Sequence, residues 1–264
     1  MIRNPFMKWL WDSRRSIIGW TLGIVVAACG YAAFWPTIAN PELQAALENY
    51  PRALLDALNY NDISTPAGYL TATVYGLIAA LLLAVFGIAS GTRTIAGDEE
   101  AGTLDLILAH PISRRRLAVQ RFGGFAASVT VIVAVLWLGM LAISGPAQLT
   151  GISAAQFAAM HVHLAAFGIL FGALSFAVGA ASGRRGLALG VGAGAAVLAY
   201  AASGIIPQVN GLAWVKDYSP FTWLTGSEPL RNGLDLADVG LLLGISAVLV
   251  AAGTYGFVRR DIAG

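Results

Sequence analysis

The sequence predicts an all-α integral membrane protein with six transmembrane helices in one domain that occupies residues 1–264. The first observation is composition: 57% of the residues are hydrophobic and only 11% are charged, whereas soluble domains have about 25% charged residues. The second observation is that the apolar residues form uncharged runs of about 20 residues, the length at which a helix crosses a bilayer. Only a helix satisfies its own backbone hydrogen bonds there, so these runs predict helical spans.

The uncharged runs place the spans in order along the chain. Residues 122–183 contain no Asp, Glu, Lys or Arg, and one helix of that length would be far longer than a bilayer is thick. The turn-rich stretch 144–151 divides the run into two spans. Pro207 ends the fifth span. We therefore expect spans at residues 17–35, 67–90, 122–143, 155–181, 187–206 and 239–258.

The basic residues predict the orientation. Six spans put both termini on one side of the membrane, and Lys and Arg gather on the cytoplasmic side. Of the sixteen Lys and Arg residues, all except Arg52, Lys216 and Arg231 lie on the side of the termini. Both termini are therefore predicted to be cytoplasmic, and we expect the protein in the plasma (inner) membrane.

Two predicted outer segments connect the spans on the other side. Segment 36–66 has Leu43, Leu47 and Leu54 at helical spacing, which predicts short amphipathic helices at the outer surface, either a structural cap or a substrate gate. Segment 207–238 mixes turn formers with aromatic residues, a composition that suits a loop returning to the membrane interface.

The cytoplasmic segment 93–116, between the second and third spans, carries the strongest functional signal. An acidic triplet precedes a Gly-Thr pair, an apolar stripe at helical spacing, a proline, a serine that can cap the next helix, and an arginine triplet. A charged loop would need no apolar stripe on a helix too short to cross the membrane. We therefore expect a docking surface for a cytoplasmic partner. Its candidate residues are Asp98, Glu99, Glu100, Gly102, Thr103, Leu104, Leu108, Pro111, Ser113 and Arg114.

The stretch AGDEEAGTLDLILAHPISRRRL resembles the signature cytoplasmic segment of bacterial type-2 ATP-binding-cassette (ABC) exporter permeases, of the form E-x-E-x-G-T-L-x-x-L-L-x-x-P-[VI]-S-R. Asp98 stands where Glu is usual, and Ile107 where Leu is frequent. Other stretches agree in the same order: RRSIIGWTLG, FWPTI, YSPFTW, EPLRNGLD and the terminal RRD. The resemblance covers essentially the whole chain.

This resemblance implies partners and an interface. It implies that two permease copies, or this chain and a paralogue, pair in the bilayer and engage two cytoplasmic ABC ATPase subunits through a coupling helix in segment 93–116. It also implies that the second and fifth spans lie at the permease interface. Gly186, Gly190 and Gly194 in the fifth span have the four-residue spacing that permits close helix approach. We expect no cofactor on this chain, with ATP and Mg bound by the ATPase.

The sequence lacks several kinds of catalytic site. No G-x-x-x-x-G-K-[ST] phosphate loop occurs, so we expect a permease rather than an enzyme, driven by its partner's ATP hydrolysis. His161 and His163 diverge on a helix, which favours packing or hydrogen bonding over a metal site. No span contains a carboxylate or a lysine, which disfavours an ion-coupled carrier. The lone Cys29 indicates no disulfide, and a net charge of +2 indicates no nucleic acid partner.

The resemblance implies outward movement of a substrate by alternating access, and the uncharged spans favour an amphiphilic substrate. The uncharged spans suit a hydrophobic drug, an antibiotic or a lipid-like molecule, as in multidrug efflux. Two alternatives remain: a membrane-embedded lipid-modifying enzyme and a membrane scaffold without transport activity. An associated ABC ATPase would distinguish the first prediction from both.

Overall fold

The computed structural model describes residues 4–40, 63–109 and 111–260, and these residues are helical without strands. Six of the helical stretches are long and apolar enough to span a membrane. The first two spans comprise α1 (Pro5–Ala33) with α2 (Trp35–Ile38), and α5 (Pro66–Leu70) with η1 (Thr71–Ile78) and α6 (Ala79–Arg93). The other four are α9 (Arg114–Ser144), α10 (Ala154–Ser182), α11 (Arg185–Gly204) with η2 (Ile206–Gln208), and α14 (Leu236–Arg259).

Each predicted span falls within one of these helical stretches, and two of the helices begin more than one helical turn before the predicted start. The helix α1 begins at Pro5 and α9 at Arg114. Side-chain caps explain both starts, because Asn4 accepts a hydrogen bond from the backbone N–H of Phe6 and Ser113 accepts one from Arg116. The cap predicted at Ser113 is therefore confirmed. With 31 residues, α9 is about 46 Å long, which exceeds the hydrocarbon core of about 30 Å.

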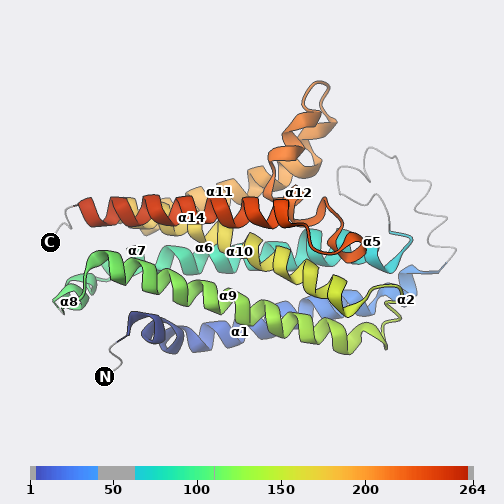
Figure 1. Cartoon of the computed structure of the whole chain (residues 1–264), viewed down its shortest axis with the longest axis horizontal. Helices are drawn as coiled ribbons and strands as arrows, with labels where there is room; N and C mark the ends of the chain where they lie inside the picture. Colours follow the sequence, from blue (N-terminus) through green and yellow to red (C-terminus); the bar gives the residue numbers. More distant parts are fainter. Residues whose placement is uncertain (1–3, 41–62, 110, 261–264) are drawn as a thin grey trace.

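The helix α10 forms the centre of the bundle. In its most apolar stretch 67% of the residues are buried, compared with 11% in the span that contains α11. It packs against α6, α14, α9 and α11, whereas α1 packs mainly on α9 (Figure 1). Among the described residues, this arrangement leaves most of α11 uncovered.

Glycines bring α6 and α10 into backbone contact. A Cβ at Gly87 would lie 2.6 Å from the carbonyl oxygen of Gly168, and one at Gly91 would lie 2.2 Å from that of Gly172. Each helix thus contributes two glycines at four-residue spacing, the pattern that lets helices approach closely in membranes. The second and fourth spans are thereby fixed against each other.

Different short helices lie at the two ends of the bundle. The start of α1 and the end of α14 lie at the same end, beside two short helices, α7 (Ala96–Glu100) and α8 (Leu104–Leu108) (Figure 1). The opposite end holds α2, α5 and the short helix α12 (Pro220–Thr225). The amphipathic helices predicted in segment 36–66 fall mainly on residues 41–62, which lie outside the described residues.

The second outer segment folds back onto the bundle through α12. It contains η3 (Ala213–Tyr218), α12 and α13 (Pro229–Asn232). The buried ring of Phe221 lies 4.9 Å from the ring of Phe167 and 5.3 Å from that of Tyr200, centroid to centroid. These contacts anchor α12 against α10 and α11.

His163 serves as a hydrogen-bonding link in this region. Its Nε2 accepts a hydrogen bond from the backbone N–H of Asp235 at 3.2 Å, so its Nδ1 carries the proton and donates to the carbonyl of Trp223 at 3.0 Å. The imidazole thereby joins α10 to α12 and to the start of α14. The predicted packing and hydrogen-bonding role is confirmed for this residue.

Candidate functional site

Segment 93–116 folds into α7 and α8, which are joined by a tight turn. Gly102 follows α7 with a φ of +64°, a left-handed conformation that a Cβ disfavours. Thr103 then bonds back to the carbonyl of Asp98, through its backbone N–H at 2.9 Å and its Oγ1 at 3.2 Å. The Gly-Thr pair noted in the sequence is therefore the turn between the two helices.

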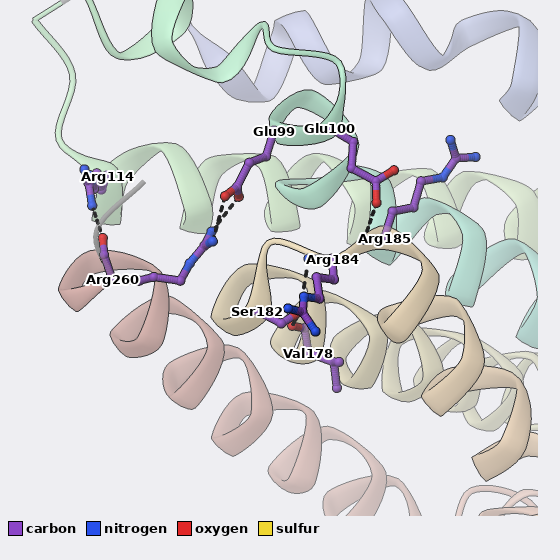
Figure 2. Close-up of polar contacts among 8 residues, drawn as sticks. All are labelled: Glu99, Glu100, Arg114, Val178, Ser182, Arg184, Arg185 and Arg260. Atoms are coloured by element: carbon purple, nitrogen blue, oxygen red, sulfur yellow. Dashed lines mark hydrogen bonds and ion pairs between the residues drawn. The ribbon is translucent and has the colours of Figure 1, made fainter. Parts of the chain in front are cut away.

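Each acidic residue of α7 contacts a different transmembrane helix of the same chain. The carboxylate of Asp98 forms an ion pair with Arg121 in α9. The carboxylate of Glu99 accepts two hydrogen bonds from the guanidinium of Arg260, at 2.6 and 2.5 Å, at the end of α14 (Figure 2). Glu100 accepts one from the backbone N–H of Arg185, at 2.9 Å, at the start of α11. The triplet therefore ties α7 to three spans.

The guanidinium of Arg121 is the most deeply buried of these charges. The residue is 7% exposed, and besides the carboxylate of Asp98 it contacts the carbonyl of Thr94 at 2.7 Å. Burying a charge is costly unless it is paired and hydrogen-bonded. Asp98 and the Thr94 carbonyl together satisfy that requirement.

Arg260 connects three elements at this end. Its guanidinium binds Glu99, and its carbonyl accepts a hydrogen bond of 2.6 Å from Arg114 at the start of α9 (Figure 2). Gly183, which follows α10 with a φ of +70°, lies against this ion pair. A Cβ at Gly183 would lie 2.2 Å from Nη1 of Arg260 and 2.5 Å from Oε1 of Glu99. A side chain at position 183 would therefore strain the backbone and collide with the ion pair between Glu99 and Arg260, so glycine is required there.

The apolar stripe of α8 faces the bundle. Leu104 is 1% exposed and belongs to a buried cluster with Leu117, Phe176 and Phe257, from α9, α10 and α14. Ile107 and Leu108 are partly buried against this cluster. Other residues of the segment form an outer face, where Leu106 is 69% exposed. The remaining exposed positions around it are Ala101, Gly102, Thr103, Asp105, Ala109 and Pro111.

The candidate residues divide into two groups in space. Those of segment 93–116 come together at one end of the bundle, whereas Gly186, Gly190 and Gly194 lie along the exposed side of α11. A Cβ at any of these three glycines would meet nothing within 4 Å. The three glycines therefore form a strip along α11 that has no side chains and that no other described residue covers.

Sequence reasoning did not identify the partners of the acidic triplet. In the sequence, Arg121 contributes only to the positive charge of one face, and Arg260 contributes to that charge and to the terminal RRD stretch. Gly183 is not among the candidate residues. Gly183 carried a usable signal, since a glycine directly after a long apolar helix is the common end of a helix. Within the described ranges, no three His, Cys, Asp or Glu side chains are grouped to hold a metal ion.

Fold and site together define a polytopic membrane protein in which a short helical segment at one end is bonded to the ends of three spans. A model of the family described as ABC-2 family transporter protein matches residues 7–262. The chain belongs to this family, which confirms the resemblance to type-2 ABC permeases. A search of curated proteins found no match. Members of the family are transport membrane domains that associate with an ABC ATPase and lack an ATPase site of their own.

Proposed function

We propose that this chain is the permease subunit of an ATP-driven exporter, and that a separate ABC ATPase docks on the outer face of α7 and α8. The observation that carries the proposal is that segment 93–116 has one face bound to the helix bundle and another face exposed. Its inner face is held by the acidic triplet and by Leu104, whereas its outer face exposes Leu106. A segment with this construction has an apolar surface for a partner and a firm connection to the membrane helices.

In the proposed mechanism, movement of α7 is transmitted to the transmembrane helices. Charge-assisted hydrogen bonds are shorter and stronger than neutral ones, and α7 makes them or ion pairs with Arg121 and Arg260. A displacement of α7 by an ATPase would therefore pull on α9 and α14 directly, and on α11 through the Glu100 contact. Such a coupled shift would drive alternating access.

The proposed orientation places α7, α8 and both termini in the cytoplasm, at the plasma (inner) membrane. It rests on the basic residues, since Lys and Arg favour the cytoplasmic side. With one ATPase for each permease, the working assembly would contain two ATPases and two permeases. The proposed contact between permeases is the uncovered strip of α11 that holds Gly186, Gly190 and Gly194.

The proposed substrate is an amphiphile such as a drug, an antibiotic or a lipid-like molecule. The supporting observation is the chemistry of α11, which carries Leu187, Val191 and Leu198 on its exposed surface and no charged residue after Arg185. A surface of this kind attracts apolar groups more readily than ions.

The docking proposal is tested by Leu106→Glu. We expect at least a tenfold loss of ATPase co-purification and of transport-stimulated ATP hydrolysis, because a charge would replace the apolar centre of the outer face. Membrane insertion and thermal stability should not change, since Leu106 is exposed. Leu236→Glu is the matched control, because Leu236 is 75% exposed in α14 at the end of the bundle opposite α7 and α8. Full ATPase binding by Leu106→Glu would refute the docking proposal.

The pairing proposal is tested by Gly190→Trp. A tryptophan there meets no described atom of the chain within 4 Å of the Cβ, so the monomer should fold while the close permease contact is lost. Gly244→Trp in α14 is the control, since its surroundings in the chain are equally open. The mass of the purified complex in detergent gives the result. An unchanged dimer in Gly190→Trp would place the permease contact elsewhere.

A further inference from the structure

An open groove lies between α9 and α14. Its volume is about 740 Å³, within the range of about 300–1,000 Å³ typical of sites for small molecules. One wall is formed by α9, at Arg115, Val119 and Phe122, and the other wall by one side of α14. Ile169 of α10 forms part of the floor. The walls are apolar except for Ser246 and for the end that holds α7 and α8, where Arg115, Thr254 and Tyr255 lie.

The groove is at least as long as one bilayer leaflet is thick. Along α9 it extends from Arg115 to Ala126 and along α14 from Leu243 to Val258, rises of about 16 Å and about 22 Å at 1.5 Å per residue. One leaflet accounts for about half of the hydrocarbon core of about 30 Å. The groove therefore extends from the end that holds α7 and α8 through the adjacent leaflet, and its apolar length accommodates an extended acyl chain.

Positive charge lies at the mouth of the groove. Arg115 lines its end, and the guanidinium of Arg259 lies 4.4 Å from the ring centroid of Tyr255, which also lines it. Among the described residues, neither arginine forms an ion pair with an acidic side chain. An anionic head group at this level would therefore meet two uncompensated positive charges.

We propose that the α9–α14 groove binds one anionic glycerophospholipid from the leaflet beside α7 and α8. One acyl chain lies along Val119 and Phe122, and the phosphate lies between Arg115 and Arg259. Basic pockets between transmembrane helices recognise anionic lipids in this way. Because Arg114 and Arg260 tie α9 to α14 just beyond the mouth, a bound lipid would hold together the two helices that the Asp98 and Glu99 contacts reach.

The test uses the purified full chain in detergent and native mass spectrometry. Palmitoyl-oleoyl phosphatidylglycerol is compared with the phosphatidylcholine that has the same acyl chains. We expect tighter binding of phosphatidylglycerol, and about fivefold weaker binding of it in Arg115→Gln, since a basic side chain near the membrane surface contributes about a factor of five. Arg116→Gln is the matched control, because Arg116 is exposed and does not line the groove.

A second pair of variants separates the groove from general surface charge. Ala251→Trp fills the groove and should remove the bound lipid, whereas Ala252→Trp, one residue along and outside the lining, should retain it. Equal binding of the two lipids, or an equal loss in Arg115→Gln and Arg116→Gln, would overturn the proposal. If Ala251→Trp instead dissociates a dimer and leaves lipid binding intact, the groove takes a second copy of the chain and not a lipid.

Discussion

At the scale of single residues, the acidic side chains of α7 are each held by a partner from another helix. Glu99 and Arg260 are 161 positions apart in the sequence, and Asp98 and Arg121 belong to different helices. Each of the two arginines also takes part in a backbone hydrogen bond, one to Thr94 and one from Arg114. A change at any one member therefore leaves a partly buried group without its partner, which is the main cost of breaking such a pair.

The first prediction concerns Asp98→Asn. Removing one partner of a fully buried ion pair costs about 3–5 kcal/mol. We expect about 2 kcal/mol for Asp98→Asn, since its side chain is 31% exposed and water partly compensates the loss. Thermal unfolding of the purified protein measures this, with Asp105→Asn on the exposed side of α8 as the control. Equal melting temperatures for the two variants would contradict the assigned ion pair.

The second prediction concerns Gly183→Ala. The left-handed backbone at this position costs a residue with a Cβ roughly 1–2 kcal/mol, and the Cβ would also displace the ion pair between Glu99 and Arg260. We expect a lower melting temperature together with weaker coupling of ATP hydrolysis to transport. Gly240→Ala, which meets open space in α14, should retain both properties. A fully coupled Gly183→Ala protein would show that this ion pair is dispensable.

At the scale of elements, the contact between α6 and α10 brings the backbones of two helices together. The Cβ positions of Gly87 and Gly91 meet backbone atoms of α10, which have no side-chain rotamer through which to move aside. Gly172 is constrained on another side as well, since its Cβ would lie 2.0 Å from the ring of Phe125. The two helices can therefore accept a larger residue here only by separating.

The third prediction follows from this packing. Gly91→Ala should destabilise the protein by about 1–3 kcal/mol, the usual cost of overpacking a core. Gly23→Ala in α1, which meets nothing within 4 Å, should leave stability unchanged or slightly increased, because alanine favours a helix. Melting temperatures in a single detergent provide the comparison. A tolerated Gly91→Ala would mean that α6 and α10 are held less closely than described.

At the scale of the whole molecule, six spans bring the start of α1, the end of α14 and segment 93–116 to one end of the bundle (Figure 1). Most basic residues belong to this end, and the helix extensions of α1 and α9 beyond the predicted spans are also here. The positive charge and segment 93–116 therefore lie on the same side of the membrane.

The fourth prediction assigns that side to the cytoplasm. In a Cys29→Ser background, a membrane-impermeant maleimide added to intact cells should label Asn210→Cys, between η2 and η3, and should not label Ala101→Cys, after α7. Both positions are exposed, so accessibility within the chain does not limit the reaction. Permeabilising the cells should make Ala101→Cys reactive. Labelling of Ala101→Cys in intact cells would reverse the proposed orientation.

The number and position of the spans were predictable because they depend on local composition. An uncharged run of about 20 residues has one low-energy arrangement in a bilayer, whatever surrounds it. The Ser113 cap was predictable for a similar reason, since it involves residues three apart. The glycine contact was missed although Gly87, Gly91, Gly168 and Gly172 show the four-residue spacing, because such spacing does not tell which helix lies opposite. The π-helical stretch η1 had no signal that we recognised.

The sequence by itself determined that the chain is helical and membrane-spanning, and it singled out segment 93–116 as the predicted docking segment. Both conclusions follow from short-range pattern, which is governed by hydrophobic transfer and helix geometry. Only the tertiary structure decided that Leu104 faces the bundle while Leu106 faces outward, and that Asp98, Glu99 and Glu100 bind three different spans. The partners of an ion pair depend on how helices are placed in space, and that placement arises from packing among residues far apart in the chain.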